Sequence, residues 1–82
     1  MYYVYVIKSL SSGKFYKGHT GNLITRIKAH NTGFSPYTKG KGPWELVYSE
    51  EFATRGEAMK REKILKSGKG REWLKEKLNN LS

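Results

Sequence analysis

The sequence predicts an α/β domain of the α+β type, in which helices flank a small, three-stranded, mostly antiparallel sheet in the order ββαβαα. Three observations support this class. β-Branched and aromatic residues dominate the first segment, 2–8, and a turn containing glycine joins it to a second extended segment. The later segments mostly carry apolar residues at helical spacing, with one further strand between them.

Two short strands come first and form a hairpin. The strand at 2–8 has bulky side chains in both of its alternating sets: Tyr3, Tyr5, Ile7 and Tyr2, Val4, Val6. Two bulky faces are typical of a strand at the centre of a sheet. Residues 11–13 supply turn chemistry, with Gly13 expected at a positive φ. The extended pattern resumes at 14–17, and we expect Gly18 and Gly21 to break the second strand.

The first helix is expected over 22–31, where Asn22 can cap it and Gly33 can stop it. Its docking stripe, at i, i+4 and i+7, is Leu23, Ile27 and His30. Arg26 and His30 are i, i+4 neighbours on this helix. The helix therefore carries both side chains along one edge of its buried face.

The second half of the chain continues with one strand and two helices. Residues 33–43 read as a loop rich in glycine and proline, and 44–52 as the third strand. The next helix, 54–66, opens on a capping box, and 67–70 are expected to break it. A last amphipathic helix is expected to dock through Trp73, Leu74, Leu78 and Leu81.

Composition bounds the class of protein. The 82 residues make one small domain, 1–82, near the lower size limit for a hydrophobic core without other support. There is no cysteine, so neither a disulfide nor a thiolate metal site can form. No apolar run is long enough to span a bilayer, and no signal peptide is evident. We therefore expect a cytoplasmic domain without a membrane partner or an organic cofactor, and the oligomeric state is left open.

The net charge of +9 favours a polyanionic partner. Its distribution is more informative than its total. Up to Trp44 the chain has 7 basic residues and no acid, whereas 9 basic residues face 7 acids from Glu45 onward. Most aromatic residues also lie in the first half, and basic side chains among aromatics suit phosphates and unstacked bases.

The acids restrict any metal chemistry. Aspartate is absent, which disfavours nucleases whose paired metals are held by several aspartates. Glu62 is the candidate ligand, because its helix places it on one stripe with Ala58 and Leu65. An unpaired buried carboxylate is costly, so Glu62 needs a cation, hydrogen-bond donors or a metal. An ion pair with Arg26 or with a lysine is the alternative to metal binding.

Four further candidates for a catalytic site come before the 33–43 loop: Tyr5, Tyr16, Arg26 and His30. A guanidinium can hold a phosphate through two hydrogen bonds and stabilise transition-state charge, although Arg26 can also pair with Glu62 or Glu57. A tyrosine phenol is protonated near neutral pH, so water activation by a tyrosine needs neighbouring cations. His30 can donate a hydrogen bond, shuttle a proton, or simply be a satisfied buried residue.

These residues and their spacing resemble the GIY-YIG endonuclease family, in particular small stand-alone members similar to the N-terminal nuclease domain found in excinucleases. In that family two aromatic motifs lie on adjacent strands, and an arginine follows the second motif by ten residues. A tyrosine or histidine comes four residues later, and a metal-binding glutamate lies on a later helix. The corresponding residues here are Tyr5, Tyr16, Arg26, His30 and Glu62. The resemblance spans about 2–66; the first motif lacks its leading glycine, and Lys17 replaces an aliphatic residue.

The resemblance implies an endonuclease that hydrolyses phosphodiester bonds in DNA, in repair or in processing of structured DNA, with RNA left open. It implies one divalent metal ion, Mg²⁺ or Mn²⁺, on Glu62. Tyr16 would activate water with help from His30 or from the metal. Arg26 would hold the scissile phosphate, and Tyr5 would order the site. One carboxylate holds magnesium weakly, so metal binding is expected to depend on phosphate oxygens of the substrate.

Five basic residues are expected to contact nucleic acid: Lys14, Lys17, His19, Lys39 and Lys41. Lys39 and Lys41 lie in a glycine-rich loop that reads either as a phosphate clamp or as a surface loop. The basic residues of the last helix alternate with Glu72 and Glu76, which indicates an ordinary solvated face. The alternative function is a non-catalytic, basic nucleic-acid-binding module, because both aromatic motifs have altered letters. A protein-interaction adaptor fits the charge less well.

Overall fold

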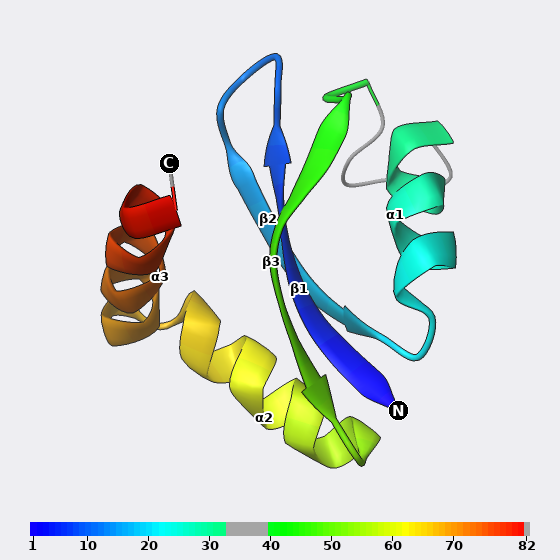
Figure 1. Ribbon diagram of the computed structural model, residues 1–82, viewed down its shortest axis with the longest axis vertical. Coiled ribbons are helices and arrows are strands. Elements are labelled where there is room, and N and C mark those ends of the chain that lie inside the picture. The colour runs from blue at the N-terminus through cyan, green and yellow to red at the C-terminus, as the bar shows by residue number, and fades with distance from the viewer. Residues whose placement is uncertain (33–39, 82) are drawn as a thin grey trace.

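Three strands and three helices follow one another in the predicted order (Figure 1). The computed structural model describes residues 1–32 and 40–81. Its elements are the strands β1 (Tyr2–Ser9), β2 (Phe15–Thr20) and β3 (Trp44–Phe52), and the helices α1 (Leu23–Thr32), α2 (Arg55–Lys66) and α3 (Gly68–Leu81). The predicted α+β class and antiparallel three-stranded sheet are confirmed. Within the described ranges, no helix has the length and apolar character needed to cross a membrane.

β1 is the central strand of the sheet, and β2 and β3 both run antiparallel to it. The run from Val4 to Ile7 is buried, because helices cover both faces of the strand (Figure 1). This confirms the central position predicted from bulky residues on both faces. In the hairpin turn, Gly13 has a φ of 75°, as expected. The Ser9 backbone N–H closes the turn by donating to the Lys14 carbonyl at 2.8 Å.

The sheet separates α1 from α2 and α3 (Figure 1). On the α1 side, Tyr5 and Ile7 of β1 pack with Trp44, and Leu23 and Ile27 of α1 cover them. On the other side, the core consists of Val4, Val6, Ala58, Leu65 and Leu74. β2 is an edge strand, so its free edge is the place where side chains from both faces can meet.

α1 is tied down at both of its ends. Oδ1 of Asn22 accepts a hydrogen bond from the Thr25 backbone N–H at 3.1 Å, which confirms the predicted cap. Near the other end, the Asn31 side chain accepts from the Trp44 N–H at 2.6 Å and donates to the Trp44 carbonyl at 3.1 Å. These two bonds hold the helix against the first residue of β3.

The break between the last two helices is shorter than the predicted 67–70, and α3 already begins at Gly68. Ser67 alone separates the helices, and its Oγ accepts from the Gly70 N–H at 3.2 Å. A Cβ on Gly70 would lie 1.9 Å from the Ile64 carbonyl oxygen. Glycine in this place therefore permits the close approach of the two helices instead of ending one of them.

Trp73 departs from the predicted docking stripe of the last helix. Leu74 is buried under the sheet, but Trp73 is 39% exposed. Its ring lies 4.8 Å from the Arg61 guanidinium and meets the Tyr48 ring edge-on at 5.7 Å. Arg61 in turn pairs with Glu50 of β3 at 2.9 Å. Trp73 therefore links α3 to α2 and β3 at the surface, while Leu74 supplies the buried contact.

Candidate active site

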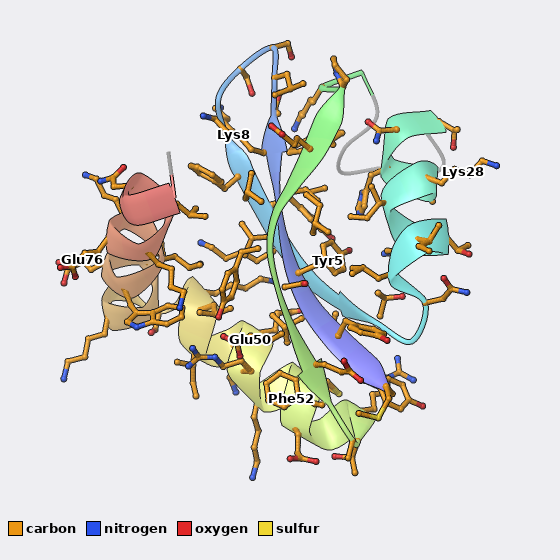
Figure 2. The ribbon with its side chains drawn as sticks, viewed as in Figure 1. Tyr5, Lys8, Lys28, Glu50, Phe52 and Glu76 are labelled. Carbon is orange, nitrogen blue, oxygen red and sulfur yellow. The ribbon has the colours of Figure 1, made fainter. Side chains whose placement is uncertain are left out.

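One cluster of polar side chains lies between the sheet and α1. Tyr5 points from β1 toward α1 (Figure 2), and its hydroxyl lies 2.9 Å from Nε2 of His30. Arg26, one turn earlier on α1, donates from Nε to the same hydroxyl at 3.4 Å. The Tyr16 ring centroid lies 5.0 Å from that of His30 and 6.4 Å from that of Tyr5. Four of the predicted site residues thus lie together, although they come from three elements.

The register of the hairpin explains this meeting. Directly paired residues of antiparallel strands share a face, and the pairs here are Ile7 with Tyr16 and Tyr5 with Gly18. A Cβ on Gly18 would lie 2.6 Å from the Tyr5 hydroxyl oxygen. The prediction that Gly18 breaks the second strand was therefore wrong, since β2 continues to Thr20. The missing side chain instead gives the Tyr5 phenol room to lie against β2.

The charges in this cluster follow from burial and from Arg26. Burial raises the pKa of the Tyr5 phenol, although the hydrogen bond from Arg26 acts to lower it. Burial, followed by the charge of Arg26, lowers the pKa of His30. The hydrogen bond to Tyr5 raises the pKa of Arg26. Near neutral pH, Tyr5 and His30 are therefore uncharged and Arg26 is a cation.

The Tyr5 hydroxyl links Arg26 to His30. It accepts a hydrogen bond from Nε of Arg26 and shares a second hydrogen bond with Nε2 of His30. Tyr5 therefore holds the side chains of both α1 residues, which fits the ordering role that the family resemblance implies for it.

Glu62 comes from α2, the helix on the opposite face from α1, and lies against β2. The pairing of Val4 with His19 turns His19 toward α2. Nδ1 of His19 lies 2.8 Å from Oε1 of Glu62, and Nζ of Lys66 lies 3.1 Å from Oε2. Partial burial acts to raise the pKa of Glu62, but the bonds from His19 and Lys66 outweigh it and lower the pKa. Glu62 is therefore an ionised carboxylate with both oxygens engaged.

The partners of Glu62 agree only in part with the sequence-based alternatives. The ion pair with a lysine is found at Lys66. An ion pair of Arg26 with Glu62 or Glu57 is not found in the described part of the chain, where Tyr5 holds Arg26. His19 is the partner that was not foreseen. The alternation of side chains along β2 could have predicted this pair, because it places His19 on the face of the sheet against which the helix carrying Glu62 packs.

One member of each group, Arg26 and His19, lines a depression beside β2. This hollow has a volume of about 410 Å³ and is lined by Tyr2, His19, Thr20, Gly21, Arg26 and Arg55. His19 therefore contacts Glu62 and also lines the hollow with Arg26. The charge of Glu62 contributes to the raised pKa of Tyr5, so it acts across the edge strand. Arg55, which the sequence did not single out, adds a second guanidinium to a hollow that has no acid in its lining.

The donor set around Glu62 fits one weakly held divalent ion. Among the described residues, no group of three or more His, Asp or Glu side chains is placed to hold a metal. Mg²⁺ commonly takes one or two protein carboxylates and completes its shell with water and substrate phosphate oxygens. Glu62 is compatible with that pattern if His19 or Lys66 releases an oxygen when substrate arrives. The residues thus fit a metal that binds together with nucleic acid.

The lysines predicted to contact nucleic acid lie in separate places. Lys14, in the hairpin turn, and Lys41, just before β3, are exposed. The Lys41 carbonyl accepts a hydrogen bond from the Ser9 hydroxyl at 2.6 Å, which attaches this end of the loop to the sheet. Lys17 is half-buried and faces α2 and α3 instead of α1. Lys39 lies outside the described residues.

Comparisons with known proteins identify relatives over most of the chain. A UPF0213 protein of Clostridium perfringens is 48% identical over 67 residues, which cover 80% of this chain and 71% of that protein. A UPF0213 protein of Staphylococcus haemolyticus is 40% identical over 75 residues, 90% of each chain. The solution NMR structure of the UPF0213 protein BH0048 from Bacillus halodurans is similar, with a TM-score of 0.54. It shares 37% sequence identity and covers 90% of this chain and 82% of that one.

A family model described as the GIY-YIG catalytic domain matches residues 1–79. This match confirms the resemblance found in the aromatic motifs and in the spacing of Arg26, His30 and Glu62. GIY-YIG nucleases typically use a divalent metal ion, which agrees with the donor set around Glu62. The chain therefore belongs to the GIY-YIG family, as a nuclease-type catalytic domain related to the UPF0213 proteins.

Proposed function

We propose that this chain, acting as a single domain over 1–82, is an endonuclease that hydrolyses phosphodiester bonds in structured DNA, in its repair or processing. The observation that carries the proposal is the depression beside β2, which Arg26 lines together with His19, the partner of Glu62. A phosphate in this hollow would meet a guanidinium from one face of the sheet and an imidazole–carboxylate pair from the other. Membership of the GIY-YIG family supports nuclease-type chemistry.

Arg26 holds the scissile phosphate in this proposal. Tyr5 positions the guanidinium through Nε, and the exposed Arg26 side chain lines the hollow. A guanidinium can donate two parallel hydrogen bonds to a phosphate and stabilise the charge that develops on its oxygens. His30 contributes through the hydrogen bond that it shares with the Tyr5 hydroxyl, because this bond holds the phenol beside Arg26.

In this proposal the Tyr16 phenol first gives its proton to His30 or to solvent, and the resulting phenolate takes a proton from the attacking water. Both Tyr5 and Tyr16 contribute to the raised pKa of Arg26, so the guanidinium is close enough to stabilise negative charge on the Tyr16 oxygen. His30, which burial keeps neutral, lies ring to ring with Tyr16 and assists as the base of the cluster. This assignment gives the second aromatic motif a chemical role and the first motif a positioning role.

Glu62 is the residue that would hold one divalent ion, Mg²⁺ or Mn²⁺. Its lowered pKa keeps it ionised well below neutral pH, which a metal ligand requires. When bound there, the ion would supply positive charge for the leaving oxygen of the phosphodiester. His19 and Lys66 hold the carboxylate in place before the substrate arrives, and they neutralise part of its charge.

A cleavage screen tests this function. Branched, nicked and flapped DNA are incubated with Mg²⁺ or Mn²⁺, with matched RNA substrates as a second arm and chelator as the metal-free control. Metal-dependent cutting that is lost in Glu62→Gln supports the proposal. If only RNA is cut, the substrate is RNA and not DNA. If cutting persists with chelator, Glu62 is not a metal ligand that cleavage requires.

A non-catalytic nucleic-acid-binding module is the second candidate, and one observation favours it. Both oxygens of Glu62 are already engaged, by His19 and by Lys66, as in a carboxylate that only joins two elements. The same screen separates the two functions. The binding module predicts salt-sensitive binding, because log K falls by roughly 0.9 per neutralised phosphate on B-DNA, but it predicts no cutting of any substrate.

A further inference from the structure

A second concave surface lies on the opposite side of β2 from the Tyr5 cluster, between the sheet and α3. It has a volume of about 370 Å³ and is lined by Val6, Phe15, Lys17, Arg71, Leu74, Lys75, Leu78 and Asn79. We call it the β2–α3 groove. Its apolar residues come from the sheet and the inner side of α3, and its charged residues are all basic. A ligand for it therefore combines an apolar or aromatic part with negative charge.

Three cations of the groove form no ion pair with any residue that the structure describes. Among residues 1–32 and 40–79, no carboxylate forms an ion pair with Lys17, Arg71 or Lys75. Figure 2 shows Glu76 on the outer side of α3, away from the sheet. Burial lowers the pKa of Lys17, and the charges of Arg71 and Lys66 lower it further. Like charges held this close disfavour the protonated lysine, and a bound anion removes that penalty.

This clustering was not visible in the sequence. The basic residues of the last helix alternate with acids, which suggested an ordinary solvated face. In the structure, Arg71 and Lys75 are one turn apart and both line the groove, together with Lys17 of β2. The fold therefore collects bases from two distant segments on one surface.

The groove is close to the proposed metal ligand. Lys66 donates to Glu62 at 3.1 Å, and its charge also acts on Lys17. His19, the other partner of Glu62, follows Lys17 by two residues on the same face of β2, or roughly 6.6 Å along the strand. A nucleic-acid strand with one phosphate beside Glu62 can therefore reach the groove with an adjoining nucleotide.

Phe15 gives the groove a surface for a base. Its side chain is 49% exposed although it begins a strand, and the Lys8 ammonium lies 5.8 Å from its ring centroid. An exposed aromatic ring beside cations is the usual platform for an unstacked base in single-strand binding proteins. A volume of about 370 Å³ is at the small end of ligand pockets and far too small for a base pair with its backbone.

We propose that the β2–α3 groove binds one unpaired nucleotide of the substrate strand next to the cleaved phosphodiester, with its phosphate on Arg71, Lys75 and Lys17 and its base on Phe15. This inference rests on the proposed nuclease function and narrows its substrate to nucleic acid with a single-stranded stretch at the cleavage point, such as a flap. A paired base would first have to leave its stack, at a cost in free energy that an unpaired base does not have. The groove therefore favours ends that are already unpaired.

Fluorescence anisotropy without divalent metal tests the groove separately from cleavage. The probes are a labelled ten-nucleotide thymidine strand and a fully paired duplex hairpin. Arg71→Gln/Lys75→Gln is compared with Lys60→Gln/Lys63→Gln, which removes the same charge from exposed positions of α2 outside the groove. The groove variant should bind the single strand on the order of tenfold more weakly, with a salt slope smaller by roughly 0.7 per lost phosphate contact.

Phe15 provides the second, independent readout. Phe15→Ala should weaken single-strand binding by on the order of tenfold with little effect on the duplex, and Phe15→Tyr should restore it. Equal weakening by the α2 control pair, or equal loss for single strand and duplex, would overturn the proposal. Displacement of the labelled strand by polyglutamate as readily as by unlabelled strand would assign the groove to acidic chains in general. If groove-dependent binding is found but no substrate is cut, the nuclease function fails and the nucleotide site remains.

Discussion

The hydroxyl of Tyr5 and Nε2 of His30, 25 residues apart in the chain, share a buried hydrogen bond of 2.9 Å. Both side chains are almost inaccessible, with exposures of 1% each. The bond connects the central strand to α1 and therefore holds the helix that carries Arg26. One interaction thus serves both the fold and the orientation of the candidate catalytic arginine.

Removing the Tyr5 hydroxyl should reduce stability. In Tyr5→Phe the buried Nε2 of His30 loses this partner, and a buried polar group that loses a hydrogen bond costs about 1–3 kcal/mol. Urea unfolding measures the difference. Tyr3→Phe is the control, because Tyr3 is only partly buried on the same strand, and it should change the free energy of unfolding by less than about 0.5 kcal/mol. Equal losses in the two variants would show that the hydrogen bond contributes nothing.

His30 should make stability fall as the solution becomes acidic. Its pKa is lowered in the folded state, so between that value and the unfolded value near 6.5 the unfolded chain binds a proton that the folded chain does not. The contribution of His30 is therefore present at about pH 7.5 and decreases as the pH falls through 6.5. Glu50 and Glu62 have lowered pKa values, so they stay ionised over this interval.

The check is urea unfolding at about pH 7.5 and about pH 5.5, for the wild type and for His30→Gln. Glutamine can still accept from Tyr5 but does not titrate. The wild type should lose more unfolding free energy on acidification than the variant. A variant that loses as much as the wild type would mean that His30 does not titrate differently in the folded state.

Gly18 and Gly56 form a matched pair for substitution by alanine. A Cβ at Gly18 would lie 2.6 Å from the Tyr5 oxygen, whereas a Cβ at Gly56 meets nothing within 4 Å. Gly18→Ala should therefore displace Tyr5, destabilise by about 1–3 kcal/mol and lower cleavage. Gly56→Ala lies in α2 and should be neutral or stabilising by up to about 1 kcal/mol. Thermal unfolding of both variants measures the difference in stability. If alanine at Gly18 left stability unchanged, that result would contradict the close approach of Tyr5 to Gly18.

Arg26→Ala should separate catalysis from binding. If Arg26 stabilises the transition state, the single-turnover cleavage rate should fall by about 10²–10³-fold, while affinity for the substrate changes far less. Arg55→Ala is the comparison, because Arg55 lines the same depression but has no bond to the Tyr5 cluster. Arg55→Ala should weaken affinity for the substrate more than it lowers the single-turnover cleavage rate. Equal losses of rate and affinity in Arg26→Ala would reduce Arg26 to a docking residue.

Local patterns predicted most of the fold. The two bulky faces of β1, the Asn22 cap and the Thr54 cap each depend on neighbours within a few residues, and all three were found. Gly18 and Gly70 were misread because a glycine looks like a break when the contact that requires it is made with another strand or helix. Glycine at each position permits a close contact that a Cβ would block. Gly18 lies against the Tyr5 phenol, and Gly70 lies against the backbone of α2.

The spacing of site residues predicted which side chains gather, but not how they pair. Tyr5, Arg26 and His30 meet through a hairpin and the helix that follows it, so their proximity is largely local. The partners of Glu62 depend on the angle at which α2 crosses β2, which no sequence pattern specifies. His19 was therefore missed as a partner, and the groove cations Lys17 and Arg71 come together for the same reason.

A double-mutant cycle between Arg26 and Glu62 tests most directly whether side chains from the two faces of the sheet form one catalytic site. Single-turnover cleavage of flapped DNA with Mg²⁺ or Mn²⁺ is measured for the wild type, Arg26→Ala, Glu62→Gln and the double variant. A single site predicts metal-dependent cutting by the wild type, a loss of at least about 10²-fold in each single variant, and a double loss much smaller than their product. The single catalytic site would be contradicted if the loss of rate in the double variant equalled the product of the two single losses. It would also be contradicted if the wild type showed no metal-dependent cutting.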